Sequence, residues 1–270
     1  MSAPAAAAEG LAYRPFRDGD LPGVLRLWEE ESGWGAITPE KWRRWYVDRP
    51  DGPCLVMVAE DGGGRVAGQL VFAPAVVRVD GEPVPAVRVG APIVERARRR
   101  RSVRHPEHPA TRLYREGARA AAAAGFRLLY AVPEHGWLPF FRWLGGFAQA
   151  DPGCLAVAPS PAAAGRARGL RAAPSAGFGA EHDVLWEQAA SSFPVRCGLE
   201  RGADRLRHRI GGHRVLEARD AGGALAGYVA VDRRTGLLVD VLARGPDELA
   251  PVLAAALAAL AEARGGGAAV

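Results

Sequence analysis

The feature that most constrains the fold is a stretch in which three apolar runs are separated by two tight turns. The runs lie at 54–60, 65–79 and 83–94, and the turns are DGGG at 61–64 and DG at 80–81. Asp-Gly and glycine-rich turns between apolar runs are typical of β-hairpins. The stretch therefore predicts an antiparallel meander of three strands.

Helices are predicted on both sides of this meander. Asp20 can cap a helix that has leucine, valine and tryptophan on one side. Thr38-Pro39-Glu40 starts a second helix, because Thr is a good N-cap and Pro suits the first helical position. The other elements of this part are predicted as a strand at 11–17, a helix at 110–124 ended by Gly125, a strand at 126–132, a short aromatic helix at 136–144 and a strand at 147–158.

A change of composition divides the chain. Residues 159–179 are rich in Ala, Pro, Gly and Arg without periodicity, which predicts a linker between a domain at 11–158 and another at 180–270. Residues 1–10 are predicted to be a disordered tail. The second domain is predicted to contain helices at 181–192 and 200–210, strands at 213–219, 224–232 and 237–243, and a final helix at 247–264.

A weak internal repeat links the two domains. Ala59–Gly68 reads AEDGGGRVAG and Ala218–Gly227 reads ARDAGGALAG, with six of ten positions identical at an offset of 159 residues. Each copy lies at a predicted strand–turn–strand. A generic hairpin turn gives some of this likeness, but the similar order of elements around both copies favours a duplication.

Composition sets limits on the class of protein. The chain is 49% hydrophobic and 24% charged, as globular proteins are, and has neither a membrane-length apolar run nor a charged signal region, so we expect a cytoplasmic protein. Cys54, Cys154 and Cys197 lack metal-site spacing and favour a reducing compartment. The net charge of +5 does not demand a polyanionic partner. The abundance of residues with GC-rich codons is typical of a high-GC bacterium.

Several stretches resemble one family. These are Tyr13–Trp28 (YRPFRDGDLPGVLRLW), Trp42–Tyr46 with Pro50, Gly125–Pro133, and Leu144–Phe147. With the order of elements in the first 158 residues, they resemble the GNAT acyltransferase superfamily, especially a bacterial branch built from two GNAT-like halves. The resemblance implies an α/β (α+β) fold: a mixed, mostly antiparallel central sheet flanked by helices, with a second, shortened GNAT-like half.

The resemblance also implies a binding loop for acyl-CoA between the strand at 83–94 and the next helix. In the family, glycines let backbone N–H groups approach the pyrophosphate. No glycine lies between Ala91 and Glu116 here. Either arginine side chains bind the phosphates instead, or this is a solvated basic loop on a domain that has lost CoA binding. The candidate cofactor-binding residues are Val94, Arg99, Arg100, Arg101, Ser102 and Val103.

The resemblance places the reaction after the strand at 126–132. Glu134 and His135 are the candidate catalytic bases, and Trp34 and Trp137 are candidates for the substrate pocket. The tyrosine that commonly protonates the leaving thiolate is missing, since its position falls on Phe141 or Arg142. The cluster His105, Glu107 and His108 is interpreted as a surface loop, and no metal is expected.

These features together predict an acyl-CoA-dependent N-acyltransferase, specifically an N-acetyltransferase. It would move the acyl group of acetyl-CoA or another acyl-CoA to the amine of a small molecule by direct attack. One alternative is a non-catalytic GNAT-like module that binds a ligand or a partner protein. Another is a Fem-like transferase that uses aminoacyl-tRNA, the one nucleic-acid partner considered. No membrane partner is expected, and the oligomeric state stays open, with a homodimer as one option.

Overall fold

The structure is a computed structural model that describes residues 10–99, 101–133, 135–144, 147, 161–194 and 196–265. The described residues form two compact units. The first contains those within 10–77 and 83–147, and the second contains 78–82 and those within 161–265. The expected domains were 11–158 and 180–270. The units differ from them because residues 78–82 and the described residues 161–179 belong to the second unit.

The first unit is built on a mixed sheet with the strand order β1-β2-β3-β4-β5. β1 pairs with β2 and β2 with β3 in antiparallel fashion, whereas β4 and β5 are parallel. The predicted mixed, mostly antiparallel central sheet is therefore confirmed. The strands are β1 (Ala12–Pro15), β2 (Leu55–Glu60), β3 (Val66–Val79), β4 (Glu82–Val94) and β5 (Leu128–Ala131).

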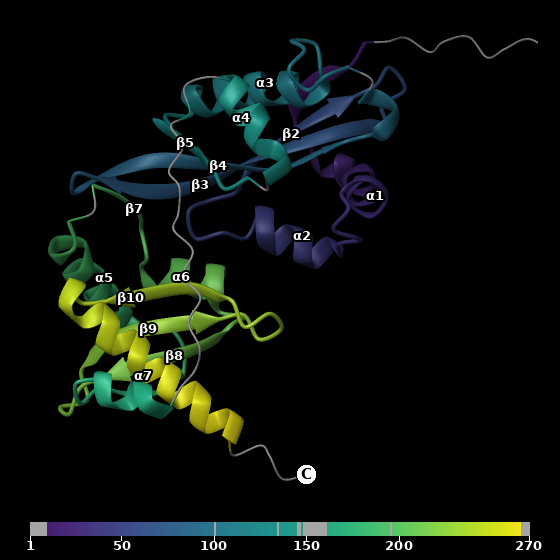
Figure 1. The fold of residues 1–270 in the computed structure, drawn as a ribbon. Coiled ribbons are helices and arrows are strands. Elements are labelled where there is room, and N and C mark those ends of the chain that lie inside the picture. The colour runs from purple at the N-terminus through teal and green to yellow at the C-terminus, as the bar shows by residue number, and fades with distance from the viewer. Residues whose placement is uncertain are drawn as a thin grey trace, which may run out of the picture. The chain divides into compact units, whose positions relative to one another are not determined.

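Helices cover both faces of this sheet (Figure 1). On one face, α1 and α2 bury Leu27 and Trp42 against β2 and β4 residues such as Val58 and Ile93. On the other face, α3 and α4 pack on a cluster around Phe72. The helices are α1 (Leu21–Glu31), α2 (Pro39–Tyr46), α3 (Pro109–Ala123) and α4 (Leu138–Leu144), with 3-10 turns η1 (Asp18–Asp20), η2 (Arg96–Arg98) and η3 (His135–Trp137).

A side chain caps the start of α2 but not the start of α1. The Thr38 hydroxyl accepts a hydrogen bond from the Lys41 N–H at 3.3 Å, which is the predicted cap of α2. Asp20 precedes α1, but its side chain does not cap that helix. Its carboxylate instead accepts the N–H of Arg17 and two bonds from the Arg14 guanidinium, at 2.7 and 2.8 Å. A nearly buried carboxylate is better satisfied by a cation than by one helix N–H.

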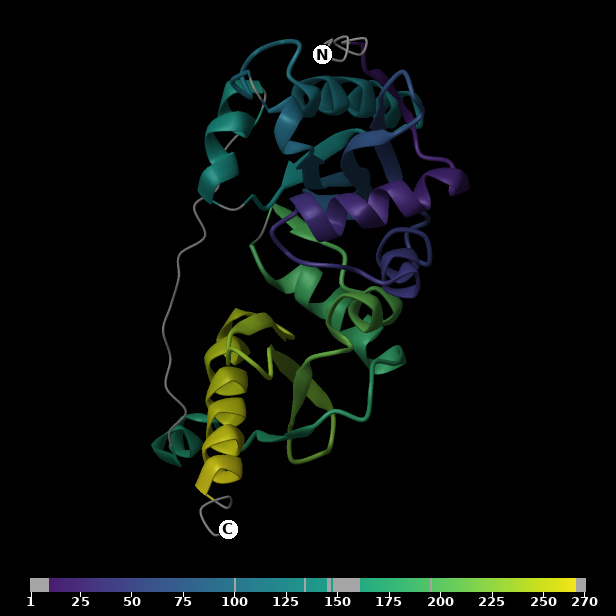
Figure 2. The ribbon, with the colours of Figure 1, turned by 90° about the vertical axis from the view of Figure 1, so that its right-hand side faces the viewer.

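The second unit has a four-stranded sheet with the order β10-β9-β8-β6. α7 packs along one face of it, and α5 and α6 pack on the opposite face (Figure 2). Its elements are η4 (Pro161–Arg166), β6 (Arg171–Pro174), α5 (Ala180–Ser192), β7 (Cys197–Leu199), α6 (Ala203–Ile210), β8 (Arg214–Arg219), β9 (Leu225–Val231), β10 (Leu238–Ala243) and α7 (Pro246–Gly265).

The expected linker at 159–179 needs correction. Its described part carries η4 and β6, and β6 pairs with β8 as the edge strand of the second sheet. The sequence of β6, Arg-Ala-Ala-Pro, lacks the alternation that marks a strand. β6 is a strand because its main chain pairs with β8 at the edge of the sheet, where a proline is tolerated. Amino-acid composition gives no signal of such pairing.

The repeated sequence forms the same turn twice. In the first unit, Ala59 pairs with Gly68 and a register shift follows at Glu60. The Asp61 carboxylate accepts the N–H groups of Gly63 and Arg65 at 3.0 and 3.1 Å. Gly64 has φ +80°, a conformation that favours glycine.

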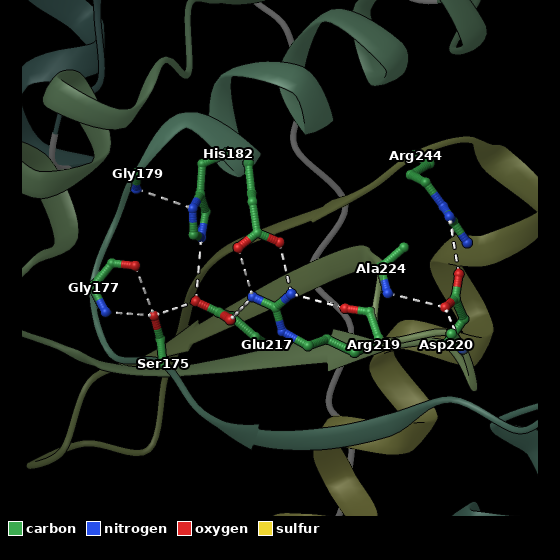
Figure 3. A network of polar contacts seen from close by, with 12 residues as sticks. Ser175, Gly177, Gly179, His182, Glu217, Arg219, Asp220, Ala224 and Arg244 are labelled. Carbon is green, nitrogen blue, oxygen red and sulfur yellow. Dashed lines mark hydrogen bonds and ion pairs between the residues drawn. The ribbon is translucent and has the colours of Figure 1, made fainter.

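In the second unit, the corresponding turn has the same contacts. Ala218 pairs with Gly227, and the register shifts after Ala218. The Asp220 carboxylate accepts the N–H groups of Gly222 and Ala224, each at 3.0 Å (Figure 3). Gly223 has φ +83°. The likeness of the two sequences is therefore a likeness of backbone hydrogen bonding.

The order of elements extends this likeness. The series β1, α1, α2, β2, β3, β4, α3 corresponds to β6, α5, α6, β8, β9, β10, α7. The pairs Ala12↔Glu60 and Arg171↔Arg219 occupy equivalent places at the 159-residue offset. The described part of the second unit has no counterparts of β5 and α4. These observations support the interpretation of a duplicated and shortened second half.

A buried histidine lies in a polar network of the second unit (Figure 3). His182 is 3% exposed, its Nδ1 accepts the N–H of Gly179 at 3.3 Å, and its Nε2 lies 3.5 Å from Glu217 Oε1. The Ser175 hydroxyl and the Arg219 guanidinium both donate to Glu217, at 2.5 and 2.7 Å. Burial lowers the pKa of His182, although Glu217 opposes this shift.

We expect His182 to make this fold less stable on mild acidification. Because its pKa is lowered in the folded state, the unfolded chain binds the proton first, and stability falls as the pH drops below about 6.5. One proton gives a slope of at most about 1.4 kcal/mol per pH unit. Urea unfolding from pH 7.5 to 5 should show a shallower loss for His182→Gln. Equal slopes in the two proteins would contradict this expectation.

Candidate active site at the opening of the first sheet

The candidate site begins where β4 and β5 separate. Their parallel pairing runs from Ala86↔Leu128 to Val89↔Ala131 and then stops, although β4 continues to Val94. Just beyond the last pair, Ala91 has φ +48°, which is unusual for a residue with a side chain. The irregular backbone of β4 thus coincides with an opening at the edge of the sheet.

A pocket of about 450 Å³ lies at this opening. Trp28 and Tyr46 reach it from the helices on one face of the sheet, and Phe141 reaches it from α4 on the other. The opening is therefore lined from both faces. The full lining is Trp28, Trp34, Trp45, Tyr46, Arg88, Val89, Gly90, Ala91, Pro92, Val132, Pro133, Trp137 and Phe141.

Aromatic rings dominate the pocket. The Trp28 ring lies 5.3 Å from the Trp34 ring and 6.0 Å from the Trp45 ring, measured between centroids. Trp28 is 5% exposed, whereas Trp34 and Trp45 are 48% and 39% exposed. Trp28 is therefore a buried part of the wall, and the other two form accessible parts. Burial raises the pKa of Tyr46, so its phenol keeps its proton at neutral pH.

A buried amide supports the irregular part of β4. Gln69 on β3 is fully buried, and its Nε2 donates to the carbonyl oxygen of Ala91 at 3.4 Å. Its Oε1 has no hydrogen-bond partner among the described residues. An unpaired buried acceptor costs free energy, so the contact with Ala91 compensates for only part of the burial of this amide.

A second recess, polar and about 680 Å³ in volume, lies at the loop after β4 and the start of α3. Four arginines and three carboxylates contribute to its lining, which leaves a small excess of positive charge. These residues are Arg65, Arg98, Arg101, Arg112, Asp61, Glu95 and Glu107.

The start of α3 offers few backbone donors to an anion. His108 is its N-cap, and its Nδ1 accepts the N–H of Ala110 at 3.2 Å. Pro109 at the first helical position has no N–H. Burial lowers the pKa of His108, which favours this neutral acceptor form. The interpretation of His108 as part of a surface loop is wrong, because its side chain is 5% exposed, whereas His105 and Glu107 are exposed as predicted.

The predicted CoA-binding residues fall into different roles. Arg99 Nε donates to the Val94 carbonyl oxygen at 2.6 Å, and its guanidinium also donates to Glu31 at 3.0 Å. These contacts fasten the loop to β4 and α1. Val94 itself is buried in the core.

The remaining residues of the predicted CoA-binding loop differ in their contacts and in their exposure. Val103 packs on the core and accepts the Thr111 hydroxyl, while the Ser102 hydroxyl oxygen accepts the Arg104 N–H. Arg101 is exposed and lines the polar recess. Arg100 lies outside the described residues.

The structure describes only some of the predicted catalytic and substrate-binding residues. Glu134 lies outside the described residues, and the structure gives the backbone of His135, in η3, but not its side chain. Trp34 and Trp137 line the same pocket, and their role in substrate binding stays a prediction. Sequence reasoning missed Trp28, Trp45, Tyr46, Arg88 and Phe141 as lining residues. The i, i+3, i+4 spacing of Trp42, Trp45 and Tyr46 on α2 is the available signal, but the same spacing is typical of a helix face buried in a core.

Other chemistry is limited in the described part of the chain. Burial raises the pKa of the Cys54 thiol to about 11, so it is a poor nucleophile at neutral pH. Among the described residues, no three His, Cys, Asp or Glu side chains are placed to hold a metal ion. Each described helix is too short or too polar to cross a lipid bilayer.

Neither protein-family models nor curated proteins match this sequence. Solved structures do. A protein of unknown function from Enterococcus faecalis, described as a probable N-acyltransferase, is 15% identical with a TM-score of 0.65; the overlap covers 94% of this chain and 63% of that one. A GCN5-related N-acetyltransferase from Kribbella flavida is 16% identical with a TM-score of 0.62, over 94% and 62%.

The chain thus spans less than two thirds of either structure, and the overlap includes both of its units. A GNAT family acetyltransferase from Brucella melitensis, solved in complex with acetyl-CoA, is 22% identical with a TM-score of 0.36, over 50% of this chain and 82% of that one. At these identities the likeness concerns the fold. With its mixed sheet, its opening after β5 and its helices on both faces, the chain has the fold of the GNAT N-acetyltransferases.

Proposed function

We propose that the chain is an acyl-CoA-dependent N-acyltransferase that acylates the amine of a small molecule. The observation that carries this proposal is the aromatic pocket at the β4–β5 opening, which is lined from both faces of the sheet. An acyl donor and an acceptor can enter such an opening from opposite sides and meet within it. The fold supports the same class of reaction.

The proposed reaction is a direct transfer. The amine nitrogen attacks the thioester carbonyl carbon, a C–N bond forms, and the C–S bond breaks. The amine loses a proton, and the departing thiolate takes one up. Glu134 and His135, just after β5, remain the proposed bases, and Tyr46 is a protonated phenol in the pocket wall.

We place the phosphates of the donor in the polar recess beside the loop after β4. Arg98 and Arg101 line this recess, and Arg98 lies 3.8 Å from Asp61 at the nearest atoms, a loose ion pair. Pro92 lines the pocket and Glu95 the recess, so about 10 Å of extended strand separates them. Arginine side chains suit phosphate through paired N–H groups, which compensates for a missing glycine cradle.

Calorimetric titration with acetyl-CoA and with CoA tests this proposal. We expect binding in the micromolar range. We expect Arg98→Ala with Arg101→Ala to weaken it about tenfold, since partly exposed charged hydrogen bonds contribute about 1 kcal/mol each or less. The matched control is Arg115→Ala with Arg119→Ala, which removes the same charge from exposed positions on α3.

An equal loss of CoA affinity in the two double variants would mean that the polar recess does not bind the phosphates. No binding of CoA at millimolar concentration would favour the non-catalytic module, for which the capped start of α3 is the supporting observation. A gel shift with aminoacyl-tRNA that weakens steeply with salt would instead favour the tRNA-dependent transferase.

A further inference from the structure

One arginine at the aromatic pocket has no hydrogen-bond or ion-pair partner among the residues that the structure describes. Arg88 is the charged residue in the described lining, and no described residue forms a hydrogen bond or ion pair with its guanidinium. By contrast, two arginines near the polar recess, Arg26 and Arg65, both donate hydrogen bonds to Glu95. An exposed guanidinium without a described partner, beside a wall of tryptophans, is suited to binding an anion that has an apolar body.

The position of Arg88 relates it to the opening. It lies opposite Tyr130 in the β4–β5 ladder, one pair before the last, Val89↔Ala131. Val87 and Val89 pack in the cluster with α3 and α4, so the alternation of the strand directs Arg88 to the face of α1 and α2. From Arg88 to Gly90, where the opening begins, is about 7 Å along the strand.

We propose that the acceptor is an amine with an apolar, aromatic body and a carboxylate, and that Arg88 binds this carboxylate. This inference rests on the proposed function, because that function supplies the amine. The carboxylate would accept two N–H groups of the guanidinium fork, a geometry that arginine favours. The body would lie against Trp34 and Trp137, and the amine would lie in the opening.

The same arrangement favours the reactive form of the amine. An ammonium group entering an apolar pocket loses hydration, and this loss favours the neutral amine, which is the nucleophile. A carboxylate on the same molecule compensates by binding to the guanidinium, so affinity does not depend on the ammonium charge.

Three probes that share a phenyl ring test the inference without an acyl donor. They are 3-phenylpropanoate, which is anionic, 2-phenylethylamine, which is cationic, and phenylalanine, which is both. We expect 3-phenylpropanoate and phenylalanine to bind more tightly than 2-phenylethylamine, measured by calorimetry and by quenching of tryptophan fluorescence. Arg88→Ala should weaken 3-phenylpropanoate binding about fivefold to tenfold, Arg88→Lys should weaken it less, and Arg119→Ala should leave it unchanged.

Equal or tighter binding of 2-phenylethylamine would overturn the inference, as would an Arg88→Ala variant with unchanged preference among the probes. Failure of 3-phenylpropanoate to bind at millimolar concentration would overturn it as well. These measurements are separate from the donor titration. If the probes behave as expected but CoA does not bind, the proposed transfer fails while the anion site stands.

Discussion

Replacing Gly117 by alanine is expected to destabilise the first unit by about 3 kcal/mol, although alanine is the better helix former. Gly117 lies in α3, where it faces the buried ring of Phe72 on β3. A Cβ at this position would lie 2.0 Å from one ring atom and 2.4 Å from another. Relief would require movement of the ring within a filled core or of the helix away from the sheet. Urea unfolding followed by circular dichroism measures the loss.

A double-mutant cycle attributes this effect to its cause. Phe72→Leu removes the two ring atoms nearest to the new methyl group, so the two changes together should cost less than the sum of the single changes. Gly19→Ala is the control, because a Cβ there has no neighbour within 4 Å. An additive cycle, or a stabilised Gly117→Ala protein, would mean that α3 can shift at little cost.

Local pattern predicted most elements of the fold. Turn residues and apolar runs located the β2–β4 meander, and the Thr-Pro-Glu start located α2. The repeat around Asp61 and Asp220 was visible because each aspartate fixes a turn through two backbone N–H groups. β6 was not visible, since four residues without alternation become a strand only through their partner β8. The predicted strand at 147–158 lies outside the described residues apart from Phe147.

The candidate site was less predictable, for a physical reason. Trp34 and Trp137 each lie beside a glycine in the sequence, which is typical of a loop, and both line the pocket. Arg99 was chosen by its place in a motif, yet its donors are directed to Val94 and Glu31. Arg88 was not considered, because a single arginine in a strand has no distinct sequence signal. Whether an arginine is paired depends on residues far away in the chain, and only the fold reveals it.

Truncation of Trp28 is expected to cost much more stability than truncation of Trp34. Trp28→Ala should cost about 3–5 kcal/mol of stability, as for other buried tryptophans, because Trp28 is 5% exposed and packs from α1 into the core cluster. Trp34→Ala should cost about 1 kcal/mol or less, since half of the side chain is already in water. Thermal or urea unfolding of the two variants gives both values.

Although Trp34 contributes little to stability, we expect it to contribute to ligand binding. In the folded Trp34→Ala protein we expect the affinity for 3-phenylpropanoate to fall about threefold to tenfold, because one aromatic contact of about 0.5–1.5 kcal/mol is lost. Trp34→Phe should restore part of it, and the affinity for CoA should not change, since Trp34 does not line the polar recess. If Trp34→Ala binds 3-phenylpropanoate like the wild type, the aromatic pocket is part of the packing of α1 and α2 and not the acceptor site. A joint loss of probe and CoA binding would instead mean that Trp34 supports the whole opening, and its assignment to the acceptor alone would be wrong.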